Sequence, residues 1–444
     1  MVSRSLAVPL RGSAYIRDSC LSNNRALSNV RACLIRTFNT ASSHSSELPL
    51  RRTSRPSERA CRARTSRIND FAFIKPSVSS QPYSTETSTP HAATSGIASL
   101  PRRSLISLSG ADAAKFLQGL ITNNVDSTRL SPFYSAFLDA RGRVLWDVFV
   151  WVWPELVAEQ GHWGCYIEVD ASEADSLMSH LKKHKLRSKI AIKGVPQIGP
   201  DGIRVWAAWG GAHQKVNDWA EIAGLEDPRA PGLFRYLANA DRDTIAEGVE
   251  PLSPCYYQTQ RYVLGIPEGQ LEIPRETALP MECNLDLNGG IDFKKGCYVG
   301  QELTIRTKHT GVVRKRILPV RFHHSESTAT QYVFPPTPQT GKEIKALDEA
   351  GAMRNGRPGG KIVAAIGTVG LASCRLEAMT SMRVSAEGGT FRPGMQFGVD
   401  VHDDVVKVEP VLHDWFVKRK ELLWDKEARK KVMSVKEQDS MELE

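Results

Sequence analysis

The stretch PMECNLDLNGGIDFKKGCYVGQE, residues 280–302, says more about fold and chemistry than any other part of this 444-residue chain. Near its end a single thiol, Cys297, stands between two glycines, and two lysines precede it. Glycine tolerates φ > 0 and close approach of other backbone, so a tight loop that exposes the thiol is expected. A nearby cation lowers the pKa of a thiol toward the reactive thiolate. The pattern therefore favours a working cysteine over the alternative, a small buried core residue.

The same stretch resembles the YgfZ-like branch of the folate-binding T-protein (GcvT) superfamily, and most closely its mitochondrial members. The signature of that branch is Lys-Gly-Cys-(Phe/Tyr)-x-Gly-Gln-Glu, and the chain matches it at every fixed position. The matching residues are Lys295, Gly296, Cys297, Tyr298, Gly300, Gln301 and Glu302. LSGADAAKFLQGLITNNV (108–125) resembles the opening of the T-protein fold, and GRVLWDVFV (142–150) resembles its strand with a key aspartate. With a weaker match at GTVGLASCRL (367–376), the resemblance covers residues 97–412.

The net charge of +9 is confined to the first 95 residues, where 14 Lys and Arg stand against 5 Asp and Glu. The rest of the chain holds 44 basic and 44 acidic residues, so no surplus there indicates a nucleic-acid partner. The leader has 13 arginines, many serines and no secretory-type apolar core, which is typical of a mitochondrial transit peptide. An Arg/Ser-rich arm that binds RNA or a partner is the alternative. Arg36-Thr37-Phe38 and Pro82-Tyr83-Ser84 are candidate processing sites.

The cysteines indicate a reducing compartment. Five of the eight follow the leader, namely Cys165, Cys255, Cys283, Cys297 and Cys374. None forms a C-x-x-C pair, and an odd number argues against a disulfide framework. A reducing mitochondrial matrix fits this usage. No window approaches the roughly 20 apolar residues of a membrane helix, so no membrane span is expected.

Strand-like and helix-like segments alternate from residue 96 onward. Leu105–Leu108 has the character of a strand, and apolar residues at i, i+3, i+4, i+7 and i+8 over 113–121 predict a helix. Further strands are expected at 134–139, 144–153 and 203–209, and a helix at 214–223. Near the C-terminus, short strands broken by glycines are expected at 363–376, 382–385, 397–401 and 405–411. This order predicts an α+β protein that ends in a small barrel or sandwich.

The resemblance implies a more definite architecture, with GcvT/YgfZ-like α/β domains around a central cavity and a C-terminal β-barrel. Five regions are expected along the chain. They are a transit peptide and linker (1–95), the GcvT-like folate-binding region with the signature (96–320), a loop insertion (321–361), the barrel (362–412) and a charged tail (413–444).

Asp147 is the first of three candidate contacts for a folate. Period-2 alternation places it on one face with Leu145 and Phe149, and the other face of the strand is apolar as well. The carboxylate is therefore expected to be buried, and either paired or raised in pKa. By resemblance, the matching aspartate of the T-protein faces the reactive nitrogens of folate. A buried aspartate that only orients a loop is the alternative.

Glu282 and Arg261 are the other two candidates. The resemblance aligns Glu282 with a carboxylate that binds the pterin ring, whose N–H edge suits a carboxylate. A surface-loop glutamate is the alternative. Arg261 lies in YYQTQRYVLGIPEG (256–269), from which it could contact the glutamate tail of folate or form a salt bridge. Tetrahydrofolate is therefore an expected ligand.

Ligand counting limits what Cys297 does alone. A [4Fe–4S] cluster usually takes four thiolates, and the cysteines show no ferredoxin-like spacing. Cys297 is expected to give one ligand to a [2Fe–2S] or [4Fe–4S] cluster shared with a partner, or to act as a nucleophile or redox thiol. Lys295 would then tune the thiol and the glycines would shape the loop. Gln301 and Glu302 would anchor the loop by hydrogen bonds.

The resemblance implies a mitochondrial matrix factor that assembles [4Fe–4S] clusters for aconitase-type enzymes and radical enzymes such as lipoate synthase. Its implied partners are A-type iron–sulfur scaffold proteins and client apoenzymes. The competing function is a folate-dependent aminomethyl transferase, with Asp147 as acid/base group and Glu282 as pterin anchor. A folate-binding regulator is a third possibility. The Lys-Gly-Cys signature favours assembly, because a transferase of this fold does not need the cysteine.

Overall fold

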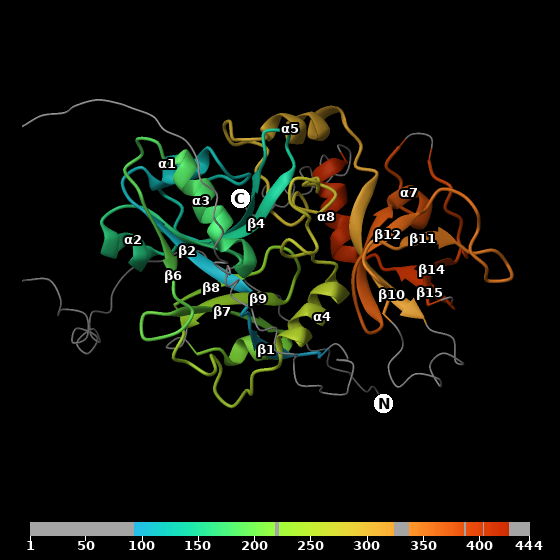
Figure 1. The fold of residues 1–444 in the computed structure, drawn as a ribbon, viewed down its shortest axis with the longest axis horizontal. Coiled ribbons are helices and arrows are strands. Elements are labelled where there is room, and N and C mark those ends of the chain that lie inside the picture. The colour runs from blue at the N-terminus through green and yellow to red at the C-terminus, as the bar shows by residue number, and fades with distance from the viewer. Residues whose placement is uncertain (1–92, 218–221, 324–336, 386–387, 403, 426–444) are drawn as a thin grey trace, which may run out of the picture. The chain divides into compact units, whose positions relative to one another are not determined.

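Three antiparallel sheets organise the residues that the computed structural model describes, which are 93–217, 222–323, 337–385, 388–402 and 404–425 (Figure 1). One sheet has five strands, one has four, and the third closes into a six-stranded barrel. The predicted α+β class with a C-terminal barrel is confirmed. The expected transit peptide and most of the charged tail lie outside the described residues. No helix in the described ranges is both long enough and apolar enough to cross a membrane.

The five-stranded sheet contains the strand of Asp147. In spatial order its strands are β3 (Phe133–Leu138), β4 (Val144–Trp151), β5 (Gly164–Asp170), β2 (Arg103–Ser109) and β6 (Ala191–Val195). Every residue of β3 and β4 is buried, so both faces of β4 pack in cores as its apolar composition predicts. Leu117 of α1 (Ala113–Gln118) and Leu181 of α3 (Ala174–His184) join the core on one of these faces. Two short helices, α2 (Pro154–Gln160) and η1 (Ala171–Glu173), flank β5.

The four-stranded sheet contributes to a second hydrophobic core, which also contains Phe149 and Trp151 of β4. Its strands, in order, are β1 (Gly96–Ser99), β7 (Ile203–Trp209), β9 (Leu233–Asn239) and β8 (Ala223–Glu226). The helix predicted at 214–223 is wrong for the described part of that range. Gly210–Lys215 forms the 3₁₀ helix η2, Val216 bridges to Ala246, and Ala223 begins β8. Pairing of β8 with β9 satisfies the backbone there in place of a helix.

The barrel begins earlier in the chain than the sequence predicts. Its strands, in order around the barrel, are β10 (Lys315–His323), β13 (Val369–Arg375), β12 (Gly360–Ile366), β11 (Glu343–Ala346), β14 (Phe397–Val401) and β15 (Asp404–Pro410). The boundary expected at 320 therefore cuts β10, and the expected insertion at 321–361 contributes β11 and the first residues of β12. The strand expected at 382–385 is absent from the described structure, where the helix α7 (Leu376–Met379) precedes this irregular segment. The helix α8 (Asp414–Trp424) follows the barrel.

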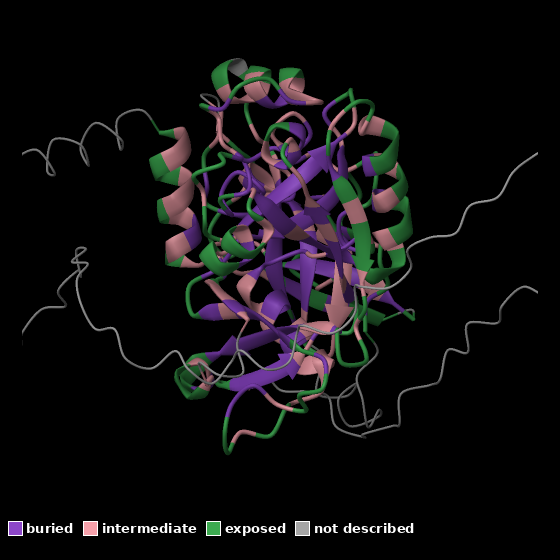
Figure 2. Ribbon diagram, turned by 90° about the vertical axis from the view of Figure 1, so that its left-hand side faces the viewer, coloured by how far each residue is buried: buried purple, intermediate pink, exposed green. Residues whose placement is uncertain are grey.

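A connection of turns, from Gly265 to Gly300, joins α4 (Pro254–Leu264) to α5 (Gln301–Thr310) and holds most of the stretch 280–302. Although irregular, its residues 283–288 are all buried. The Asn284 side chain supports this conformation, because its amide donates to the carbonyl of Ile317 at 2.6 Å. Figure 2 shows the strands largely buried and the outer helix faces exposed. The turns thus carry the chain from the core to the surface at the start of α5.

Candidate functional site

Cys297 lies on the loop that leads into α5, and it is exposed. The other described cysteines differ from it, because Cys165, Cys283 and Cys374 are buried and Cys255 is partly buried. Burial raises the pKa of each of the three buried thiols, which makes them poor nucleophiles at neutral pH. Cys297 is therefore the cysteine best placed to meet another molecule.

Lys295 anchors this loop to the end of α1. Its ammonium donates to the carbonyls of Gln118 at 2.8 Å, Ile121 at 2.7 Å and Asn123 at 2.8 Å. These bonds use all three of its donors, so none remains for a thiolate. Burial lowers the pKa of Lys295 to about 8. The structure thus gives Lys295 a role in positioning the loop, and the expected tuning of the thiol by its charge stays a prediction.

Gly300 is the glycine that the loop geometry requires. Its φ of +80° is left-handed, and a Cβ there would lie 2.8 Å from the Cβ of Leu138 and collide with the carbonyl of Asp139. The loop thereby packs on the β3–β4 turn, where Gly142 also has a positive φ of 79°. Gly296 has no such constraint, because its φ is not left-handed and a Cβ would meet nothing within 4 Å. Of the two glycines, only Gly300 has the expected shaping role.

Of the last two residues of the signature, only Gln301 contacts the thiol loop. The Gln301 amide reaches back to the carbonyl of Gly296 at 3.4 Å, which spans the thiol loop as expected. Glu302 instead pairs with Arg306 on the exposed side of α5. Tyr298 is buried, and its ring lies 4.9 Å from the Lys295 ammonium. Across the described ranges, no three His, Cys, Asp or Glu side chains are grouped as a metal site requires.

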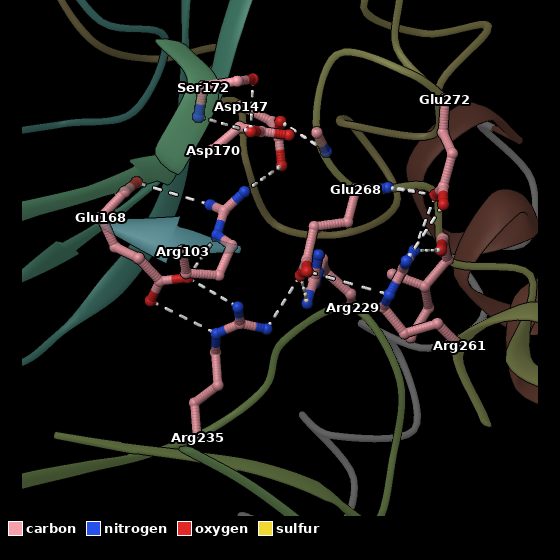
Figure 3. Close-up of polar contacts among 12 residues, drawn as sticks. Arg103, Asp147, Glu168, Asp170, Ser172, Arg229, Arg235, Arg261, Glu268 and Glu272 are labelled. Atoms are coloured by element: carbon pink, nitrogen blue, oxygen red, sulfur yellow. Dashed lines mark hydrogen bonds and ion pairs between the residues drawn. The ribbon is translucent and has the colours of Figure 1, made fainter. Parts of the chain in front are cut away.

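Asp147 belongs to a buried network of acidic and basic side chains (Figure 3). The residue is 1% exposed, its Oδ1 accepts from the Gly269 amide at 3.0 Å, and its Oδ2 lies 4.0 Å from Arg103 Nη1. Burial raises the pKa of Asp147, although the charge of Arg103 opposes that shift. The prediction of a buried, paired or pKa-raised carboxylate is confirmed.

The sequence analysis missed five residues of this network. Glu168 on β5 accepts from Arg103 at 2.7 Å and from Arg235 at 2.6 Å, and Glu268 lies 2.9 Å from both Arg229 and Arg235. The attraction of these arginines outweighs burial and lowers the pKa of both glutamates. A signal was present, because Glu168 and Arg235 interrupt apolar strands just as Asp147 does.

Arg261 is engaged within the protein. Its guanidinium binds the Glu272 carboxylate in a bidentate manner, at 2.7 and 3.0 Å, and also donates to the carbonyl of Ile266 at 2.8 Å. The residue is 5% exposed. The salt bridge that the sequence left as an alternative is the arrangement observed, and the expected contact with a glutamate tail does not fit it.

Glu282 lies in a different environment from Asp147 and Arg261. Its carboxylate is partly exposed, lies 3.6 Å from the Lys315 ammonium, and lines a cavity of about 810 Å³. Asp147 and Arg261 do not line that cavity. The three residues expected to hold a folate therefore do not converge on it, and tetrahydrofolate binding stays a prediction.

Comparisons with known proteins agree with this architecture. Residues 314–418 match the family described as CAF17, C-terminal beta-barrel domain, which is consistent with a barrel that begins at β10. A crystal structure of the glycine cleavage system aminomethyltransferase T from Bartonella henselae is similar, with a TM-score of 0.52 over 74% of this chain and 87% of that one. At 13% sequence identity this likeness shows the fold alone.

Closer relatives come from fungi. The chain is 63% identical over 367 residues to the Iron-sulfur cluster assembly factor IBA57 homolog, mitochondrial, of Phaeosphaeria nodorum, covering 81% of this chain and 90% of that protein. Proteins of the same name from Coccidioides immitis and Aspergillus fumigatus are 42% and 40% identical. These two matches cover 68% and 69% of this chain, and 76% and 75% of the relatives.

Proposed function

The chain belongs to the family of mitochondrial Iba57 homologues, and on this basis we propose that it acts as an assembly factor for iron–sulfur clusters. The relatives carry this function in their names. The proposal for this chain is that Cys297 is the working thiol, and that it offers one ligand to a cluster shared with a partner.

The observation that carries the proposal is the contrast between Cys297 and the other cysteines. Cys297 is exposed on a loop that Lys295 fixes through three hydrogen bonds and that Gly300 holds against the β3–β4 turn. A fixed, accessible thiol suits a ligand that must meet a cluster on another protein without a large ordering cost. Because a cluster usually takes four thiolates, the remaining ligands come from the partner.

The partner and the clients follow from the family resemblance. We propose an A-type iron–sulfur scaffold as the partner, the mitochondrial matrix as the compartment, and [4Fe–4S] enzymes of the aconitase and lipoate synthase types as clients. The transferase alternative is weaker, because its acid/base group would be Asp147, which is 1% exposed and already bonded to the Gly269 amide. We derive no step through a folate.

Anaerobic reconstitution tests the proposal. The full-length protein is mixed with an A-type scaffold, iron, sulfide and a reductant, and the cluster is followed by absorption and Mössbauer spectroscopy. Cys297→Ser is expected to prevent the shared cluster, whereas the matched variant Cys255→Ser leaves the spectra unchanged. Identical spectra for wild type and Cys297→Ser would refute the role of this thiol.

A further inference from the structure

The cavity of about 810 Å³ lies where α5 meets the barrel. Leu303 and Thr307 of α5 form one wall, and the segment 279–282 forms another. The start of β10, the end of β13 and α7 form most of the rest, together with Arg143, Arg357, Gly389 and Thr390. Its volume is in the range that holds a small organic molecule rather than a protein surface.

Positive charge dominates this cavity. Five cationic side chains line it, namely Arg143, Arg314, Lys315, Arg357 and Arg375. Only two acids face them, Glu282 and Glu377. If all of these groups are ionised, the lining carries a surplus of three positive charges.

Neither acid forms an ion pair within 4 Å with an arginine of the cavity among the described residues. Glu282 pairs with Lys315 at 3.6 Å. One oxygen of Glu377 accepts from the amides of Val384 and Ser385 at 2.9 and 2.7 Å, and these bonds lower its pKa. Both carboxylates therefore have partners of their own.

Three arginines of the lining form no close ion pair. Arg314, Arg357 and Arg375 have no carboxylate within 4 Å among the described residues, although the charge of Arg314 acts on Glu377 from farther away. Burial lowers the pKa of Arg375, and the charge of Arg357 lowers it further, so Arg357 lies near enough to repel Arg375. Lys315 is also the cross-strand partner of Arg375, so a further cation adjoins the pair. Like charges held this close are stabilised when an anion lies between them.

Much of the rest of the lining is apolar, although Thr304 and Thr390 also belong to it. Leu279, Leu303, Val312 and Val313 lie among the cations, and the hydroxyl of Thr307 is already bonded to the carbonyl of Leu303 at 2.8 Å. A ligand that fills this space needs an apolar frame as well as anionic groups.

We propose that this cavity binds a small organic anion carrying two or more carboxylate or phosphate groups. The guanidinium groups of Arg314, Arg357 and Arg375 bind the anionic groups, and the leucine and valine side chains contact the frame. Because α5 begins directly after the thiol loop, the ligand connects this loop to the barrel. The inference does not depend on the role of Cys297.

Isothermal titration calorimetry of the full-length protein tests the site. The probes are citrate for carboxylates and pyrophosphate for phosphates, with uncharged sucrose as a blank. The informative variant is Arg357→Gln/Arg375→Gln, and the matched control is Arg321→Gln, an exposed arginine of β10 that does not line the cavity. Circular dichroism checks that both variants are folded.

We expect saturable binding of at least one anion, equal for wild type and Arg321→Gln. The double variant is expected to weaken this binding by about tenfold or more, since each charge-assisted hydrogen bond is worth about that factor. Which probe binds more tightly decides between carboxylate and phosphate. The proposal is wrong if neither anion binds saturably, or if the double variant and the Arg321→Gln control behave alike.

Discussion

Replacing Lys295 by methionine probes the anchor of the thiol loop. The change keeps the length and apolar stem of the side chain and removes the ammonium that three carbonyls share. A buried acceptor left without its partner costs about 1–3 kcal/mol. Water can replace the ammonium at the partly buried carbonyl of Gln118, so two carbonyls carry most of the loss. Relief of the ammonium's own burial, which lowers the pKa of Lys295 to about 8, offsets part of it.

The net loss in the free energy of unfolding is therefore about 2–4 kcal/mol, which corresponds to a fall of about 4–8 °C in Tm for a fold of this size. Lys294→Met is the matched control, because Lys294 is exposed and adjacent in sequence. Differential scanning calorimetry and urea denaturation at pH 7 measure both variants. Equal stability of Lys295→Met and Lys294→Met would refute the anchoring role.

Three further predictions test the loop, the buried acid and the barrel junction. Gly300→Ala is expected to lower the free energy of unfolding by about 2–4 kcal/mol, because residue 300 has a φ of +80° and a Cβ there would contact Leu138 Cβ. Gly296→Ala is expected to lower it by less than about 1 kcal/mol. Similar urea midpoints for the two variants would contradict this. Burial raises the pKa of Asp147, so the stability this group contributes is present below its ordinary pKa of 3.8 and is lost as pH rises through its folded value. The Tm of Asp147→Asn should therefore rise relative to wild type between about pH 4 and pH 7 in calorimetry, and a relative fall would show that ion pairing dominates. Arg316→Met leaves the buried Asp286 without its bidentate partner at 2.8 Å and is expected to cost about 3–5 kcal/mol in urea denaturation, whereas a loss below about 1 kcal/mol would contradict the pairing.

Local patterns predicted the elements that surround the site. The apolar residues on both faces of β4 indicated a central strand and a buried Asp147, and both are observed. The glycine at 300 indicated a tight turn, which its left-handed φ requires. These features depend on near neighbours in the chain, and such interactions are visible in the sequence.

Partners that are distant in the chain could not be predicted in this way. Lys295 was expected to act on the adjacent thiol, yet its carbonyl partners lie more than 170 residues earlier. Arg261 similarly finds Glu272 through the fold of the turns that follow α4. Long-range packing decides which acceptor a flexible cation reaches, and sequence spacing carries no record of it.

The secondary-structure predictions that failed also failed because of contacts between distant parts of the chain. The apolar spacing over 214–223 resembled a helix, but pairing of β8 with β9 determines the backbone of Ala223. The segment before residue 361 is rich in Ser, Thr, Pro and Gly, and its composition therefore did not indicate β11. This strand has four residues and is stabilised by pairing with its barrel neighbours β12 and β14.

Aconitase activity in a strain that lacks the endogenous protein tests the central claim most directly. The strain receives wild type, Cys297→Ser, Asp147→Asn or Cys255→Ser, each at matched abundance in mitochondria. If Cys297 is the working thiol of an assembly factor, Cys297→Ser fails to restore aconitase activity and the other three restore it. Full activity with Cys297→Ser, together with loss for Asp147→Asn, would contradict the account and favour folate chemistry at the buried acid.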